Sequence, residues 1–88
     1  MASELARLNA DAEAGVVEAQ LQLADLYENG LGVKEDYGRA AYWYQKAAAQ
    51  HSIKAYARLG QMYLRGIGVA RDEYQASKLF HLAAEQDD

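Results

Sequence analysis

The sequence of 88 residues contains no proline and no cysteine, and only one tryptophan and one phenylalanine. Without proline, no helix is interrupted by a missing backbone donor. Without cysteine, disulfide bonds and thiolate metal ligands are excluded, although the compartment stays open on this ground. No run of about 18 apolar residues occurs, so we expect neither a transmembrane helix nor a membrane partner.

The start of the sequence also lacks the basic residues and the apolar stretch of a signal peptide. We therefore expect a cytoplasmic chain by default. The compartment is unknown if the sequence is a domain excised from a longer protein.

The abundant residues favour helices. Hydrophobic residues make up 51% of the chain and charged residues 25%, which predicts a folded domain rather than a disordered chain. Alanine and leucine are the commonest apolar residues, and both lose little side-chain entropy in a helix. A chain of this length forms one small domain at most.

An internal repeat decides the fold. When the sequence is shifted by 36 residues against itself, small and aromatic residues coincide at many positions. The coinciding pairs include Ala19 with Ala55, Leu23 with Leu59, Tyr27 with Tyr63, Gly30 with Gly66, Gly32 with Gly68, Asp36 with Asp72, Ala40 with Ala76 and Ala47 with Ala83. A period in this range indicates stacked supersecondary units.

Each unit has two apolar stripes at helical spacing, joined by a short segment with two glycines. Gly30 and Gly66 suit the left-handed position that follows a helix. Asp36 and Asp72 suit the N-cap of the next helix, and Gln75 is expected to complete a capping box with Asp72. We predict helices near residues 3–14, 17–29, 37–50, 53–65 and 73–86.

These elements predict an all-α fold, a right-handed α-α superhelix (solenoid) of antiparallel helix pairs with about five helices. Among the aromatic residues, Trp43 and Tyr44 are expected in the core. Tyr42 and Tyr56 are expected to be exposed and available to a partner.

The order of the repeated residues resembles the Sel-1-like repeat, a relative of the tetratricopeptide repeat. The residues that carry the resemblance are Ala19, Leu23, Tyr27, Gly30, Gly32, Val33, Asp36, Ala40, Trp43, Tyr44, Ala47 and Ala48. The resemblance divides the chain into residues 1–14, similar to the end of a preceding repeat, and two repeats, 15–50 and 51–88, the second with a short acidic tail. It implies an adaptor or scaffold that binds proteins, and it implies no common catalytic site.

Charge falls in blocks along the chain. Residues 4–36 hold eight acidic and two basic residues, residues 37–71 hold six basic residues and no acid, and residues 72–88 hold five acidic residues and one base. By analogy with tetratricopeptide domains, the first helix of each repeat lines a concave groove. The predicted partner-binding residues on these helices are Glu18, Leu21, Asp25, Lys54, Arg58, Gln61 and Arg65.

Two interpretations of the basic residues stay open. Lys54, Arg58 and Arg65 share one face of a helix, where they can engage acidic groups of a partner protein or peptide. Alternatively, they pair with Glu18 and Asp25 on the neighbouring helix or are simply solvated.

Other classes of function have less support. The two histidines, His51 and His81, lack the spacing of metal ligands, and no serine lies in a His–acid setting, so we predict no metal, no cofactor and no enzyme. The net charge of −4 argues against nucleic acid. Because solenoids with so few repeats expose their ends, here Leu79, Phe80 and Leu82, the alternative is a homo-oligomer or part of a longer array.

Overall fold

A computed structural model describes residues 2–86, which form five α-helices and no strand. The helices are α1 (Ala2–Glu13), α2 (Val17–Asn29), α3 (Tyr37–Ala48), α4 (Ile53–Arg65) and α5 (Glu73–Gln86). The predicted fold class is confirmed, and one helix is shorter than predicted. The third helix ends at Ala48 because residues 49–51 form a turn in which His51 adopts a left-handed conformation with φ of 67°.

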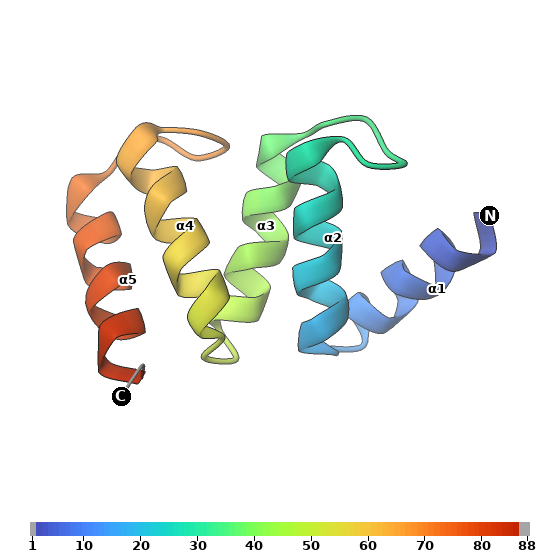
Figure 1. The fold of residues 1–88 in the computed structure, drawn as a ribbon, viewed down its shortest axis with the longest axis horizontal. Helices are drawn as coiled ribbons and strands as arrows, with labels where there is room; N and C mark the ends of the chain where they lie inside the picture. The colour runs from blue at the N-terminus through green and yellow to red at the C-terminus, as the bar shows by residue number, and fades with distance from the viewer. Residues whose placement is uncertain (1, 87–88) are drawn as a thin grey trace.

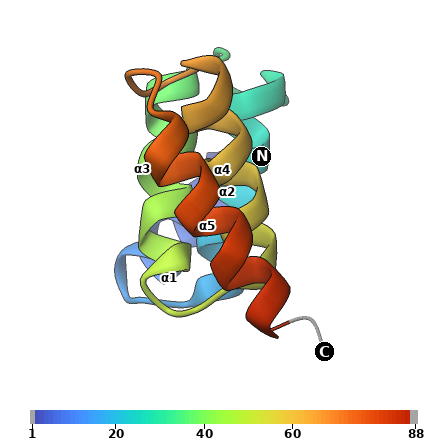
Figure 2. The same ribbon diagram turned by 90° about the vertical axis from the view of Figure 1, so that its left-hand side faces the viewer.

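The helices stand in a row and alternate in direction, as Figure 1 shows. α2 packs most extensively on α3, and α4 on α5, so the row consists of two antiparallel helix pairs. The end view in Figure 2 places α3 and α4 on opposite sides of the row. α1 packs on α2 but leans away from it toward the N-terminus (Figure 1). The molecule measures 39 × 25 × 16 Å.

The same loop closes both helix pairs. Gly30 and Gly66 follow α2 and α4 with φ of 65° and 70°, a conformation that glycine adopts without steric cost. Further along each loop, the Asp36 N–H donates to the Tyr27 carbonyl at 2.8 Å, and the Asp72 N–H donates to the Tyr63 carbonyl at 2.9 Å. The repeated sequence therefore produces repeated hydrogen bonds.

Both predicted aspartate caps are confirmed. The Asp36 carboxylate accepts a hydrogen bond from the Arg39 N–H at 3.0 Å, and the Asp72 carboxylate accepts one from the Gln75 N–H at 3.1 Å. The predicted capping box with the Gln75 side chain is wrong, because the Asp72 N–H that it would satisfy donates to the Tyr63 carbonyl instead.

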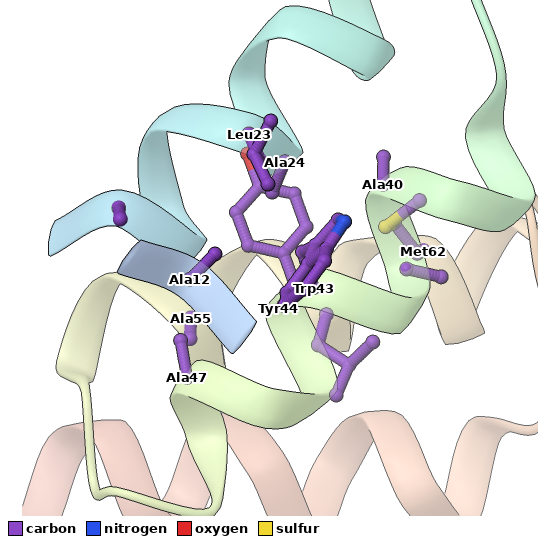
Figure 3. Close-up of a cluster of buried hydrophobic side chains, with 12 residues drawn as sticks. Ala12, Leu23, Ala24, Ala40, Trp43, Tyr44, Ala47, Ala55 and Met62 are labelled. Carbon is purple, nitrogen blue, oxygen red and sulfur yellow. The ribbon is translucent and has the colours of Figure 1, made fainter. Parts of the chain in front are cut away.

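The core is built from alanines around a few large side chains. Tyr44 and Leu23 are fully buried, and Trp43 is 8% exposed, so both aromatic core predictions are confirmed. Figure 3 shows the Tyr44 and Trp43 rings beside Leu23 and the small side chains that surround them. Small residues let the helices approach closely, and the rings fill the wider gaps.

Two predictions of exposure need correction. Tyr56 is buried, because its ring faces the turn before α4, where its hydroxyl lies 2.9 Å from Nδ1 of His51. Tyr42 is exposed, as predicted.

Phe80 on α5 is half-buried rather than exposed, because its ring packs over Gly60, where a Cβ would lie 2.9 Å from the ring. Leu79 and Leu82 are also half-buried.

Candidate functional site

The candidate site is on the face formed by α2 and α4, the first helices of the two repeats. α4 presents Lys54, Arg58, Gln61 and Arg65, and the structure leaves all four exposed. The amphipathic pattern of α4 explains this placement, because its opposite stripe of Ala55, Leu59 and Met62 is buried in the core.

Lys54 is engaged within the chain. Its Nζ donates to Oδ2 of Asp25 on α2 at 3.0 Å, so for this residue the intramolecular alternative is the one observed. Oδ1 of Asp25 accepts a second hydrogen bond from the Tyr44 hydroxyl at 2.6 Å. The same hydroxyl lies 2.9 Å from Oε1 of Glu28, so two carboxylates of α2 converge on one buried phenol.

Within this cluster the pKa of Asp25 is lowered and the pKa of Tyr44 is raised. Burial raises the pKa of Asp25, but hydrogen bonds from Tyr44 and Lys54 and the charges of Lys54 and Arg58 lower it by more, so the net pKa is below its ordinary value. Burial raises the pKa of Tyr44, and the two carboxylates raise it further. Asp25 is therefore a carboxylate at neutral pH and Tyr44 is a neutral phenol. Together with Lys54, they tie α2, α3 and α4 together.

The remaining predicted residues of α2 differ in accessibility. Glu18 is exposed in the first turn of α2, whereas Leu21 is half-buried and packs against the core. Neither lines the hollow between the C-terminal ends of α2 and α4, where Arg58, Gln61 and Arg65 of the predicted set come together.

A hollow of about 320 Å³ lies between the C-terminal ends of α2 and α4. The residues that line it are Glu28, Asn29, Glu35, Tyr37, Arg58, Gln61, Met62, Arg65 and Ile67. Six of the nine were not among the predicted partner-binding residues, and three of these six, Glu35, Tyr37 and Ile67, come from the loops and the start of α3. A sequence signal was present, because the short loop from Gly30 to the N-cap Asp36 must turn back toward α2. Glu35 therefore lies close to the end of α2, beside Gly30.

The hollow has a basic side and an acidic side. Among the residues that the structure describes, neither Arg58 nor Arg65 has a carboxylate within ion-pair distance, and the same holds for Glu28 and Glu35 with respect to basic groups. Glu28 lies against the Tyr44 hydroxyl and Glu35 is a neighbour of Tyr37, so the two carboxylates have phenol neighbours but no basic partner in the described chain.

Within residues 2–86, no group of three or more His, Asp or Glu side chains lies close enough together to hold a metal ion. None of the helices in this range is both long and apolar enough to cross a bilayer.

Comparison with known proteins supports the repeat. The family model described as "Sel1 repeat" matches residues 17–52 and 53–88, two stretches of the same length as the observed period. A search of curated proteins gave no match.

Similar solved structures contain the same fold. A protective antigen of uropathogenic Escherichia coli with an SLR fold is 42% identical, with a TM-score of 0.87, and covers 92% of this chain. A Sel1 repeat protein from Oxalobacter formigenes is 38% identical (TM-score 0.88), and the cysteine rich protein B of Helicobacter pylori is 33% identical (TM-score 0.86), each again over 92% of this chain. The matches span 17%, 24% and 61% of those three proteins.

Two matched repeats thus account for most of the sequence, and the helix pairs and loops of the structure repeat with the same period. The chain belongs to the Sel1 repeat family.

Proposed function

We propose that this chain is a protein–protein interaction module that holds a segment of a partner protein on the face of α2 and α4. Sel1 repeats are helical scaffolds that generally mediate interactions between proteins and are generally not catalytic. The observation that carries the proposal is the open hollow with two unpaired arginines, Arg58 and Arg65. Arginine is the residue best suited to hold a carboxylate at an interface, because its planar guanidinium donates two parallel hydrogen bonds.

The predicted residues take different roles in this proposal. Arg58, Gln61 and Arg65 contact the partner directly, since they line the hollow. Asp25 and Lys54 act as positioning residues, since their ion pair holds α2 and α4 of the two repeats in place relative to each other. Glu18 and Leu21 lie outside the hollow and contact only a longer segment of the partner.

The test is affinity capture from lysate of the source cells, followed by measurement of the captured protein's affinity. The double variant Arg58→Glu, Arg65→Glu is expected to lose the partner. The matched control, Arg7→Glu, Lys78→Glu, makes the same change in charge at exposed residues of the outer helices α1 and α5 and is expected to keep it. Equal capture by both variants contradicts the proposal. Circular dichroism confirms that both variants remain helical.

A second candidate function is assembly of copies through the ends of the row. Tyr74 on α5 is 74% exposed, and a hollow of about 460 Å³ between α1 and α2 is lined by apolar side chains that include Leu5, Leu8 and Leu26. Large exposed apolar groups at the ends favour contact between molecules. Analytical ultracentrifugation at increasing protein concentration separates this candidate from the first. Assembly predicts that the average molecular mass rises with concentration and that Tyr74→Lys reduces the rise.

A further inference from the structure

The hollow is not uniformly basic. Its α4 side carries Arg58 and Arg65, and its other side, at the end of α2 and the loop that follows, carries Glu28 and Glu35. The four charges sum to zero. A purely acidic partner segment would gain from the arginines and be repelled by the glutamates.

The acidic side of the hollow has no basic residue of the described chain paired with its carboxylates. The last turn of α2 contains no basic residue, yet it contains Glu28. The C-terminal end of a helix carries a partial negative charge, so a carboxylate there raises the local negative potential and favours a cation nearby. No base of the described chain fills that place within ion-pair distance of Glu28 or Glu35.

The basic side has the opposite character. Arg58 contributes to lowering the pKa of Asp25, so it lies near that carboxylate, but Lys54 is the residue that pairs with it. Arg65 lies in the last turn of α4, where a positive charge is favoured. Both guanidinium groups line the open hollow.

The two sides do not neutralise each other. No ion pair joins Glu28 or Glu35 to Arg58 or Arg65 in the described chain, and the hollow of about 320 Å³ separates them. A ligand that carries both charges can pair with both sides at once.

The lining between the charges suits a peptide backbone. Gln61 is exposed and offers an amide donor and an amide acceptor. The ring of Tyr37, which is 42% exposed, offers an apolar surface beside it.

We propose that the hollow selects an extended segment of a partner protein that carries both an acidic and a basic side chain, the acid toward Arg58 and Arg65 and the base toward Glu28 and Glu35. Successive side chains of an extended chain point to opposite sides. The acid and the base therefore stand at positions i and i+1, or i and i+3, whose numbers differ by an odd value. This inference rests on the proposed function and specifies the chemistry of its partner.

The probe is a library of random dodecapeptides displayed on phage and selected on the wild-type protein. Peptides that survive are synthesised, and their affinities are measured for wild type, Arg65→Glu and Glu35→Lys. Glu35 is the acid chosen because it and its neighbour Tyr37 are both exposed, whereas Glu28 contacts the buried Tyr44. Glu13→Lys, an exposed acid at the end of α1, is the matched control.

The inference predicts selected peptides with both charges at odd separation. It also predicts that Arg65→Glu and Glu35→Lys each weaken binding by about fivefold, the scale expected of one exposed ion pair, while Glu13→Lys has no effect.

The sign of the Glu35→Lys effect separates the possible failures. If selected peptides are acidic only and Glu35→Lys strengthens their binding while Arg65→Glu weakens it, the inference is wrong and the proposed function stands. If no selected peptide depends on Arg65 or Glu35, both the inference and the placement of the partner at this face are wrong.

Discussion

Gly32 and Gly68 occupy equivalent positions in the two repeats and share the same backbone φ of 78°, but their surroundings differ. A Cβ on Gly32 would meet nothing within 4 Å. A Cβ on Gly68 would lie 2.3 Å from the backbone carbonyl oxygen of Tyr37, because the second loop rests against the start of α3. The second glycine is therefore required by a contact between repeats as well as by its turn.

The two glycines provide a matched pair for mutation. Gly32→Ala should cost about 1 kcal/mol of unfolding free energy, the strain of alanine at positive φ. Gly68→Ala should cost about 1–3 kcal/mol more, because the backbone of α3 must move. Urea unfolding measures both values. Equal losses would show that the loop does not hold α3 as closely as the structure indicates.

Tyr44 also differs from its counterpart in a coordinated way. Its hydroxyl lies between Asp25 and Glu28, whereas the equivalent residues of the second repeat are Phe80, Gln61 and Leu64. A hydroxyl has one proton, so it donates to one carboxylate at a time. Where the hydroxyl is missing, both carboxylates are missing as well.

This coordination predicts how Tyr44→Phe behaves. The variant should lose about 1–2 kcal/mol, because it leaves two close carboxylates without their shared donor. In a Lys54→Met background, where the pair between Lys54 and Asp25 is already absent, adding Asp25→Gln and Glu28→Leu copies the set of the second repeat and should restore at least half of that loss. Thermal unfolding of the single and triple variants in that background tests this, and a triple variant less stable than the single one would contradict it.

At the scale of the helices, the contact between Lys54 and Asp25 joins α2 to α4 across the repeat boundary. The pKa of Asp25 is lowered in the folded chain from its ordinary value of 3.8. A depressed pKa contributes stability that is present above the unfolded value and is lost as the pH falls through the folded one. The contact should therefore weaken below about pH 4.

Lys54→Met tests this dependence. At pH 7 the variant should be less stable than wild type by up to about 1 kcal/mol, since the pair is partly exposed. The difference should shrink toward zero as the pH falls below the pKa of Asp25. Lys46→Met is the control, because Lys46 contacts the Tyr42 ring and no carboxylate, so its effect should not follow this pH profile. A constant difference for Lys54→Met from pH 7 to pH 2.5 would contradict the account.

The helices and most of their ends were predictable from the sequence because their determinants are local. Gly30, Asp36 and their repeats act within one turn of the backbone. The exception is the third helix, which ends at Ala48, ahead of the turn in which His51 adopts a left-handed conformation.

The other failed predictions involve contacts between elements. Whether Tyr56 is buried depends on the turn that holds His51, and the capping box with Gln75 fails because the Asp72 N–H donates to a carbonyl of the preceding helix. Periodicity alone carries no information on those contacts.

At the scale of the whole molecule, the basic block of residues 37–71 is divided among different surroundings. Arg39 lies over the Tyr27 ring and pairs with Asp36, and Arg71 pairs with Glu73. Lys46 lies over the Tyr42 ring, and Lys54 pairs with Asp25. The two arginines without an ion pair in the described chain, Arg58 and Arg65, both line the hollow. The sequence predicted Arg58 and Arg65 as binding residues together with Lys54. The hollow that the two arginines line depends on the loop between α2 and α3, whose position the sequence pattern does not give.

We propose that partners bind at the hollow between the C-terminal ends of α2 and α4. The most direct test of this proposal is NMR chemical-shift mapping of the ¹⁵N-labelled chain during titration with a peptide selected on the wild-type protein. The account predicts that the largest amide shifts cluster at residues 28–37 and 58–67, which surround the hollow. Largest shifts on α1 or α5, with residues 58–67 unchanged, would contradict it and place the binding surface elsewhere on the molecule.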